Sequence, residues 1–106
     1  MIFNAIKEKY PEMIVVGTVG PFNEGTDYVE GWKLADKLGI PMVDEHYYQT
    51  PGWFLNNQDF YDKYDRSKKT KVYLGEYATH IPGRKANIET ALTEALYLAA
   101  LERNGD

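Results

Sequence analysis

Short apolar runs alternate along this chain with segments whose apolar residues recur at helical spacing. Three runs, at residues 13–19, 40–48 and 71–77, are short and rich in β-branched or aromatic side chains, and a loop with proline and glycine follows each. Apolar runs of this kind are typical of strands in a parallel sheet that is covered on both faces. The pattern therefore predicts three strands, with the first buried on both of its faces.

Two helices are predicted around the first strand. Residues 2–10 carry apolar side chains at helical spacing, and this pattern stops at Pro11. Residues 27–38 show the same spacing between Asp27, which we expect to be the N-cap, and Gly39 at the C-terminal end.

Two more helices are predicted in the second half of the chain. Residues 57–65 are rich in Tyr and Phe and follow Thr50-Pro51-Gly52, which we interpret as a loop. The clearest helix pattern covers residues 86–103 and ends at Asn104-Gly105. It predicts a buried apolar stripe made of Ile88, Ala91, Leu92, Ala95, Leu98 and Ala99.

The alternation of about three strands with four helices predicts an α/β fold. Parallel β/α units of this kind form either a small open sheet or part of a (β/α)8 barrel, and both place ligands at the carboxyl ends of the strands. At 106 residues, the chain is at most one domain. We therefore expect polar residues that follow the strands to be the first candidates for function.

Composition narrows the possible partners more than it narrows the fold. The chain is 43% hydrophobic and 26% charged, as in an ordinary globular protein, but 14% aromatic with nine Tyr. Tyr-rich surfaces suit sugar rings and also ordinary protein interfaces. The net charge of −4 disfavours nucleic acid, and the absence of cysteine excludes disulfides and thiolate metal sites. We expect no cofactor and no metal.

The ends and charge runs of the sequence give further expectations. No apolar run approaches the roughly 20 residues of a membrane span, so we expect no membrane association, and the sequence leaves cytoplasmic, periplasmic or secreted location open. The first ten residues lack a signal-peptide pattern and resemble the middle of a helix, which suggests that the chain starts inside a longer protein. Residues 66–71 form a basic cluster that we interpret as a solvated turn.

The ends of the second and third strands carry the chemistry. Alternation predicts that Val72, Leu74 and Glu76 share one face, and that His46 and Tyr48 share one face of the neighbouring strand. A carboxylate at the end of an apolar strand is unfavourable to bury unless it is hydrogen-bonded. An imidazole and a phenol could supply those bonds and hold Glu76 ionised as a nucleophile.

Simpler structural roles are possible for the same residues. Glu76 could cap a loop or pair with Arg84, and His46 could be a structural histidine. We interpret His80 as a loop residue. Trp53, next to Phe54, either lines a sugar subsite or pins its loop to the sheet.

Hydrolysis of a sugar by retention needs a second carboxyl group. The pair Asn23-Glu24 is tempting, because Asn-Glu often introduces the acid/base of a glycosidase barrel. It lies about five residues beyond the first strand, however, and we interpret Glu24 as a structural loop residue.

Several stretches resemble family 51 of the glycoside hydrolases, the α-L-arabinofuranosidases. They are Asp44-Glu45-His46-Tyr47-Tyr48, Pro51-Gly52-Trp53-Phe54, residues 61–66, residues 71–78, residues 93–95 and residues 101–104. The resemblance implies that residues 1–106 are a fragment of a (β/α)8 catalytic barrel, covering its fifth to seventh strands, and that the whole enzyme also has a β-sandwich. It also implies removal of terminal arabinofuranose from arabinan or arabinoxylan with retention of configuration.

The same resemblance assigns roles to three residues. Glu76 matches the nucleophile at the end of the seventh strand, and His46 and Tyr48 match residues that contact the sugar and the nucleophile. The family's acid/base lies before the first residue of this chain. We keep Trp53 as a further candidate for contact with an arabinose-containing oligosaccharide or polysaccharide.

Two expectations follow for the isolated chain, and two rival interpretations remain. We expect little or no turnover without the acid/base, and self-association through exposed sheet edges. One rival is a non-catalytic, aromatic-rich α/β module that binds glycan or another partner. The other is a flavodoxin-like domain that binds a nucleotide or protein, and the acidic first turn at residues 20–25 argues against its phosphate loop.

Overall fold

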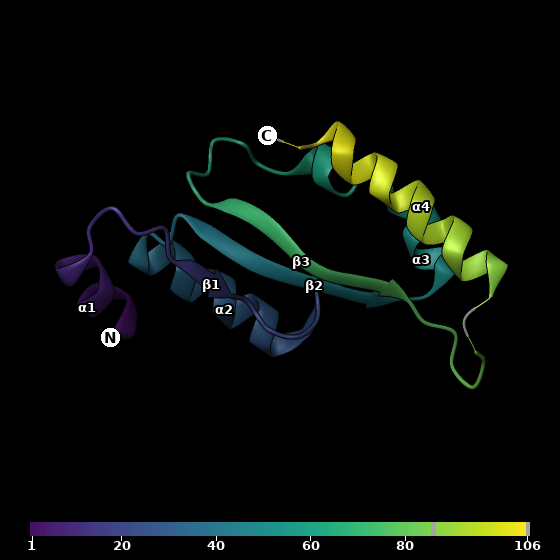
Figure 1. Ribbon diagram of the computed structural model, residues 1–106, viewed down its shortest axis with the longest axis horizontal. Coiled ribbons are helices and arrows are strands. Elements are labelled where there is room, and N and C mark those ends of the chain that lie inside the picture. The colour runs from purple at the N-terminus through teal and green to yellow at the C-terminus, as the bar shows by residue number, and fades with distance from the viewer. Residues whose placement is uncertain (86, 106) are drawn as a thin grey trace. The chain divides into compact units, whose positions relative to one another are not determined.

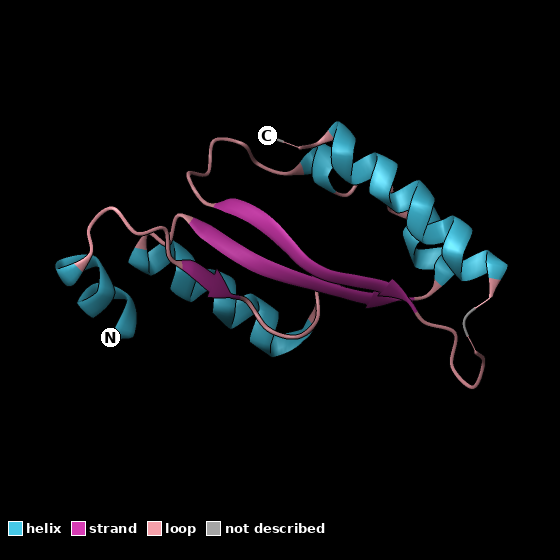
Figure 2. Ribbon diagram, viewed as in Figure 1, coloured by secondary structure: helices cyan, strands magenta, loops and turns pink. Residues whose placement is uncertain are grey.

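The computed structural model describes residues 1–85 and 87–105, and Figures 1 and 2 show the course of the chain. The predicted alternation of strands and helices is confirmed. The elements follow the order α1 (Ile2–Lys9), β1 (Val16–Thr18), α2 (Gly25–Leu38), β2 (Met42–Gln49), α3 (Pro51–Asn56), the 3-10 helix η1 (Tyr61–Lys63), β3 (Lys71–Thr79) and α4 (Ile88–Arg103). The predicted first residue of the last helix, Ala86, lies outside the described residues.

The three strands form one sheet in the order β1-β2-β3. Strand β1 pairs with β2 in parallel, with Val16 opposite Met42 and Thr18 opposite Asp44. The backbone nitrogen of Lys71, at the start of β3, donates to the carbonyl of Pro41, just before β2. The backbone nitrogen of His80, just after β3, donates to the carbonyl of Gln49, at the end of β2. The chain divides into two compact units, Met1–His46 with Lys68–Gly75 and Tyr47–Ser67 with Glu76–Asp106, so that β2 and β3 each contribute to both.

The core of the first unit lies where α2 packs on β1 and β2. Val19, Ala35, Ile40 and Val43 are buried there, and Val72 of β3 packs against them. Close packing requires a glycine in α2, because a Cβ built on Gly31 would lie 2.7 Å from the Cα of Val19.

Strand β1 is shorter and more exposed than the sequence predicts. Only Val16–Thr18 form the strand. Ile14 is 69% exposed and Val16 is 45% exposed, so the expectation of a strand buried on both faces is wrong. Strand β1 is an edge strand of the described sheet, and Val19, just beyond it, provides the buried contact with α2.

Helix α2 begins earlier than predicted. Glu24 is its N-cap residue and makes no capping bond with its side chain, while Asp27 lies in the first turn. The prediction of Asp27 as the N-cap is therefore wrong. An acidic residue in the first turn still interacts favourably with the positive end of the helix dipole.

A buried carboxylate links α2 to β2 within the first unit. Glu45 is 1% exposed. Its Oε1 accepts hydrogen bonds from the hydroxyl of Tyr28 at 2.9 Å and from the indole nitrogen of Trp32 at 2.8 Å. Both donors come from α2, so these bonds fix the helix on the strand while they satisfy the buried charge.

The second unit contains a short helix where the sequence predicts a loop. Pro51–Asn56 form α3, with Thr50 as the N-cap, whose hydroxyl accepts from the backbone nitrogen of Trp53 at 3.3 Å. Proline suits the first helical position because its φ angle is already helical and it needs no hydrogen-bond acceptor. The predictions of a loop at residues 50–52 and a helix over residues 57–65 are therefore wrong, since residues 57–65 form turns around η1.

Aromatic rings form the core of the second unit, where α4 runs beside α3 (Figure 1). The rings of Phe54 and Tyr97 are 4.7 Å apart between centroids, and Tyr47 lies 5.7 Å from Trp53. Edge-to-face and tilted contacts of this kind are favourable beyond the area they bury. The aromatic cluster consists of Tyr47, Trp53, Phe54, Phe60, Tyr61, Tyr77 and Tyr97.

Helix α4 buries a different face from the one its pattern predicts. Its buried residues are Thr90, Thr93, Tyr97 and Ala100. The predicted apolar stripe is exposed, as the exposed fractions of 74% for Ile88 and 58% for Leu92 show, so that prediction is wrong. The threonines can be buried because their hydroxyls bond within the helix, Thr93 to the Glu89 carbonyl at 2.8 Å and Thr90 to the Asn87 carbonyl at 2.7 Å.

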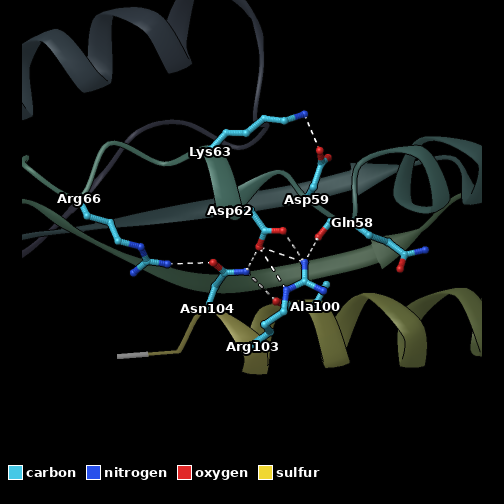
Figure 3. A network of polar contacts seen from close by, with 8 residues as sticks. All are labelled: Gln58, Asp59, Asp62, Lys63, Arg66, Ala100, Arg103 and Asn104. Carbon is cyan, nitrogen blue, oxygen red and sulfur yellow. Dashed lines mark hydrogen bonds and ion pairs between the residues drawn. The ribbon is translucent and has the colours of Figure 1, made fainter.

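A polar network joins the end of α4 to η1 (Figure 3). Asp62 accepts from the Arg103 guanidinium at 2.8 Å and from the Asn104 amide at 2.7 Å. Arg66 in turn donates to Asn104 at 2.8 Å. The bonds from Asn104 and Arg103 lower the pKa of Asp62 below its ordinary value. Arg66, at the start of the predicted basic turn, thus has a structural partner.

Candidate functional site

Glu76 and Tyr48 meet within the second unit. The hydroxyl of Tyr48 donates a short hydrogen bond to Oε2 of Glu76. Both side chains are exposed, and Tyr48 is 41% exposed. The bond to Glu76 is the largest cause of a raised pKa for Tyr48, with partial burial and the negative charge of Glu76 adding to it. The phenol therefore stays protonated and available as a donor to the carboxylate.

The alternative pairing of Glu76 with Arg84 is not observed. Arg84 lies in an exposed turn, where its backbone nitrogen donates to the carbonyl of Ile81 at 3.0 Å. Among the described residues, its side chain makes no ion pair. Glu76 therefore accepts a hydrogen bond from the phenol of Tyr48 and does not pair with Arg84.

Strand β3 contains one residue more than β2 between matched backbone bonds. In the first unit, the nitrogen of Lys71 donates to the carbonyl of Pro41 at 2.9 Å, and in the second, the nitrogen of His80 donates to that of Gln49 at 2.8 Å. The two donors are nine residues apart, whereas the two acceptors are eight apart. One extra residue in a strand is a β-bulge, which turns neighbouring side chains to a new face.

The bulge explains why Glu76 meets Tyr48. Val72 packs in the core with Val43, and normal alternation would keep Glu76 on that same face. Instead Gly75 lies against Asp44, on the opposite face of β2, and Glu76 bonds to Tyr48, which alternation places on the same face as Asp44. The prediction that Val72, Leu74 and Glu76 share one face is therefore wrong.

His46 lies in the first unit and has a carboxylate partner on the same strand. Its Nε2 is 2.9 Å from Oδ2 of Asp44, and the two side chains are 20% and 27% exposed. Residues two apart on a strand share a face. Among the sequence predictions, Asp44 appears only within the motif at residues 44–48 and not as a partner of His46.

The three remaining candidate residues are Trp53, Glu24 and His80. The half-buried ring of Trp53 belongs to the aromatic cluster, where it packs 5.3 Å from Phe54 between ring centroids. Glu24 is exposed at the start of α2, and His80 follows β3, with its backbone bonded to Gln49. A sugar contact by Trp53 stays a prediction.

Glu94 of α4 was not anticipated. Its Oε1 accepts from the backbone nitrogen of Thr79 at 2.8 Å and from the Thr79 hydroxyl at 3.0 Å. These bonds secure the end of β3, three residues after Glu76. Burial raises the pKa of Tyr77, and the negative charge of Glu94 adds to this shift. A spacing of 15 residues across a loop gives no sequence signal for such a contact.

Comparisons with known proteins show what this arrangement resembles. The chain is 46% identical over 102 residues to an extracellular exo-α-L-arabinofuranosidase of Streptomyces chartreusis, covering 96% of this chain and 12% of the relative. It is 29% identical over 112 residues to a probable α-L-arabinofuranosidase A of Aspergillus terreus, covering 98% of this chain and 15% of the relative. The chain matches part of an α-L-arabinofuranosidase.

A solved structure supports the same match at the level of the fold. An arabinose-bound GH51 α-L-arabinofuranosidase superimposes with a TM-score of 0.62 at 25% identity, over 96% of this chain and 17% of that one. The resemblance to family 51 and the α/β fold with a parallel sheet, as in a fragment of its catalytic barrel, are thereby confirmed. The chain spans only about an eighth of the length of the first relative. No family model matches the sequence.

A helix can cross a membrane only if it is long and apolar enough. None of the helices in residues 1–85 and 87–105 combines the length and apolar character needed to cross a bilayer.

Proposed function

We propose that Glu76 is the nucleophile of a retaining α-L-arabinofuranosidase, in the full-length enzyme to which this segment contributes. The observation that supports this role most directly is the hydrogen bond from Tyr48 to an exposed Glu76 carboxylate. Retaining hydrolysis requires a carboxylate that attacks the anomeric carbon, and a phenol donor aims such a group without neutralising it. Similarity to named arabinofuranosidases over nearly the whole chain supports the substrate class.

The nucleophile can be tested in the full-length protein with an aryl α-L-arabinofuranoside. Glu76→Ala should lower kcat by a factor on the order of 10⁴, as is seen when a group at the centre of covalent catalysis is removed. Added azide should restore turnover and give an arabinosyl azide of inverted configuration, because the small anion attacks from the face that Glu76 vacates.

The matched control is Glu24→Gln, which changes an exposed carboxylate of the same chain. It should leave kcat and KM close to wild type. If Glu76→Ala kept normal activity, Glu76 would not be the nucleophile, and the rival interpretation as a non-catalytic glycan-binding module would be favoured.

We further propose roles in the full-length enzyme for Tyr48, His46 and Trp53. Tyr48 holds the Glu76 carboxylate, and His46 and Trp53 contact the arabinofuranosyl unit of arabinan or arabinoxylan. The solved relative is named as arabinose-bound, which supports an arabinose-containing ligand. Saturation-transfer NMR on the full-length protein should show contacts to arabinose that weaken in Trp53→Ala. An unchanged signal in that variant would remove Trp53 from the site.

We also propose that the 106-residue chain does not hydrolyse arabinofuranosides by itself. Retention needs a second carboxyl group about 5–5.5 Å from the nucleophile, and the other candidate in this sequence, Glu24, is an exposed N-cap residue. The known relatives are also much longer than this segment. A steady-state assay of the purified chain that matched the full-length rate would contradict this proposal.

The isolated chain should also self-associate. Strand β1 is an edge of the described sheet, where Val16 of the strand and Ile14 just before it are exposed. On α4, Ile88, Leu92 and Leu96 are exposed. Unpaired strand edges and exposed apolar faces favour association. Light scattering should show a mass that rises with concentration, and Leu92→Lys should weaken the rise if α4 takes part. A monomer mass at all concentrations would oppose the proposal.

A further inference from the structure

We infer that Asp44 is a positioning residue that fixes the orientation and tautomer of His46. This inference deepens the proposed function, on which it rests for its catalytic meaning. The two side chains lie on the same face of β2, and Oδ2 of Asp44 is 2.9 Å from Nε2 of His46. An ionised carboxylate only accepts hydrogen bonds, so the imidazole nitrogen that faces it carries a proton.

The packing around Asp44 shows that its carboxyl group is held in place rather than free to rotate. Its side chain is 27% exposed, and Oδ1 is fully buried without a hydrogen-bond partner among the described residues. A buried oxygen with no donor is unfavourable. Oδ1 of Asp44 stays buried without a donor because neighbouring groups confine the carboxyl group to its present orientation.

Gly75 of β3 provides one wall of this confinement. A Cβ at position 75 would lie 3.0 Å from Cγ of Asp44 and would overlap Oδ1. The carboxyl group therefore occupies the space that a side chain at position 75 would fill. The φ angle of Gly75 is not positive, so this glycine is required by the space that Asp44 fills rather than by backbone strain.

The consequence is a chain of contacts within the first unit that ends at the imidazole. The backbone of Gly75 confines Asp44, and Asp44 holds His46 by its Nε2 edge. A histidine whose protonated nitrogen is fixed has a defined ring orientation in which to contact a substrate.

The tautomer can be measured directly in the 106-residue chain, which contains only two histidines, His46 and His80. Long-range ¹H–¹⁵N correlation spectra at neutral or higher pH should show His46 protonated at Nε2 in the wild type. Asp44→Asn should shift His46 toward a mixture of tautomers, because an amide can donate as well as accept. Gly75→Ala should do the same by displacing the carboxyl group. His80 serves as the internal control and should not change.

Activity in the full-length protein provides a second readout. Asp44→Asn should lower kcat/KM by about 10²-fold, the order expected when a contacting group is misplaced. If Asp44 acts through His46, the double variant Asp44→Asn/His46→Ala should lose no more activity than His46→Ala alone, whereas independent structural effects would add.

The two readouts separate this inference from the proposed function. An unchanged His46 tautomer in both Asp44→Asn and Gly75→Ala would overturn the inference, as would additive losses in the double variant. A full-length protein that is inactive on every arabinofuranoside would overturn the proposed function while the tautomer result still decided the role of Asp44.

Discussion

Replacing Gly31 with alanine tests the packing of α2 on the sheet at a single atom. The added Cβ would lie 2.7 Å from Cα of Val19, 3.1 Å from its carbonyl carbon and 3.2 Å from its Cβ. Two of these neighbours are backbone atoms, and Val19 is 1% exposed in the core. Val19 cannot rotate these atoms away from the new methyl group of residue 31, so α2 has to move away from Val19.

The magnitude of the effect follows from two opposing contributions. Overpacking of a core by one methyl group destabilises by about 1–3 kcal/mol. Alanine in place of glycine within a helix stabilises by about 1 kcal/mol. The net expectation for Gly31→Ala is a loss of unfolding free energy of up to about 2 kcal/mol.

Gly52 in α3 is a matched control because it gains the same methyl group without the clash. A Cβ there would meet only the hydroxyl oxygen of Thr50, at 4.0 Å, so Gly52→Ala should be neutral or stabilising by up to about 1 kcal/mol. Urea unfolding followed by circular dichroism measures both variants. If Gly31→Ala unfolded at the same urea concentration as Gly52→Ala, the close approach of α2 to Val19 would be refuted.

Two further predictions concern polar contacts in the two units. Trp32→Phe removes one donor to the buried Glu45 and should lower the unfolding free energy by about 1.5–3 kcal/mol, the range for a bond to a charged group; in a Glu45→Gln background the loss should shrink, and an equal loss in both would show that the charge is unimportant. The pKa of Asp62 is lowered below its ordinary 3.8 by Asn104 and Arg103, so its contribution to stability is present above that pH and is lost as the pH falls through the lower folded pKa. Asp62→Asn should therefore flatten the acid side of the stability curve, measured as urea midpoint against pH, and an acid limb as steep as wild type would contradict this.

Much of the fold follows from patterns that the sequence carries locally. Apolar runs separated by proline and glycine predicted β2 and β3 to within two residues at each end, and helical spacing predicted α1, α2 and α4. Helix α3 was missed because Thr50-Pro51-Gly52 has the composition of a turn, although a threonine before a proline is equally a helix start. Local composition does not distinguish these two uses of the same residues.

The face that α4 buries could not be deduced from apolar spacing, and the reason is physical. Its stripe of Ile88, Leu92 and their neighbours is the more apolar face, yet Tyr97 is the residue that enters the aromatic cluster. A single large ring that contacts several others contributes more burial than several alanines. The threonines beside it satisfy their hydroxyls within the helix and so add little opposition to burial.

The candidate site shows the same limit more sharply, because its key contact depends on register. The sequence identified Glu76 and Tyr48 as candidates by residue type and position at strand ends, and the comparisons support the family from which their roles were inferred. Yet strict alternation would have turned Glu76 toward the side of β3 on which Val72 meets the core. One extra residue in β3 reverses the face, and Gly75, which has no side chain to displace Asp44, lies directly before Glu76. Backbone pairing sets this register, so side-chain periodicity could suggest which groups take part but not which face of the strand presents them.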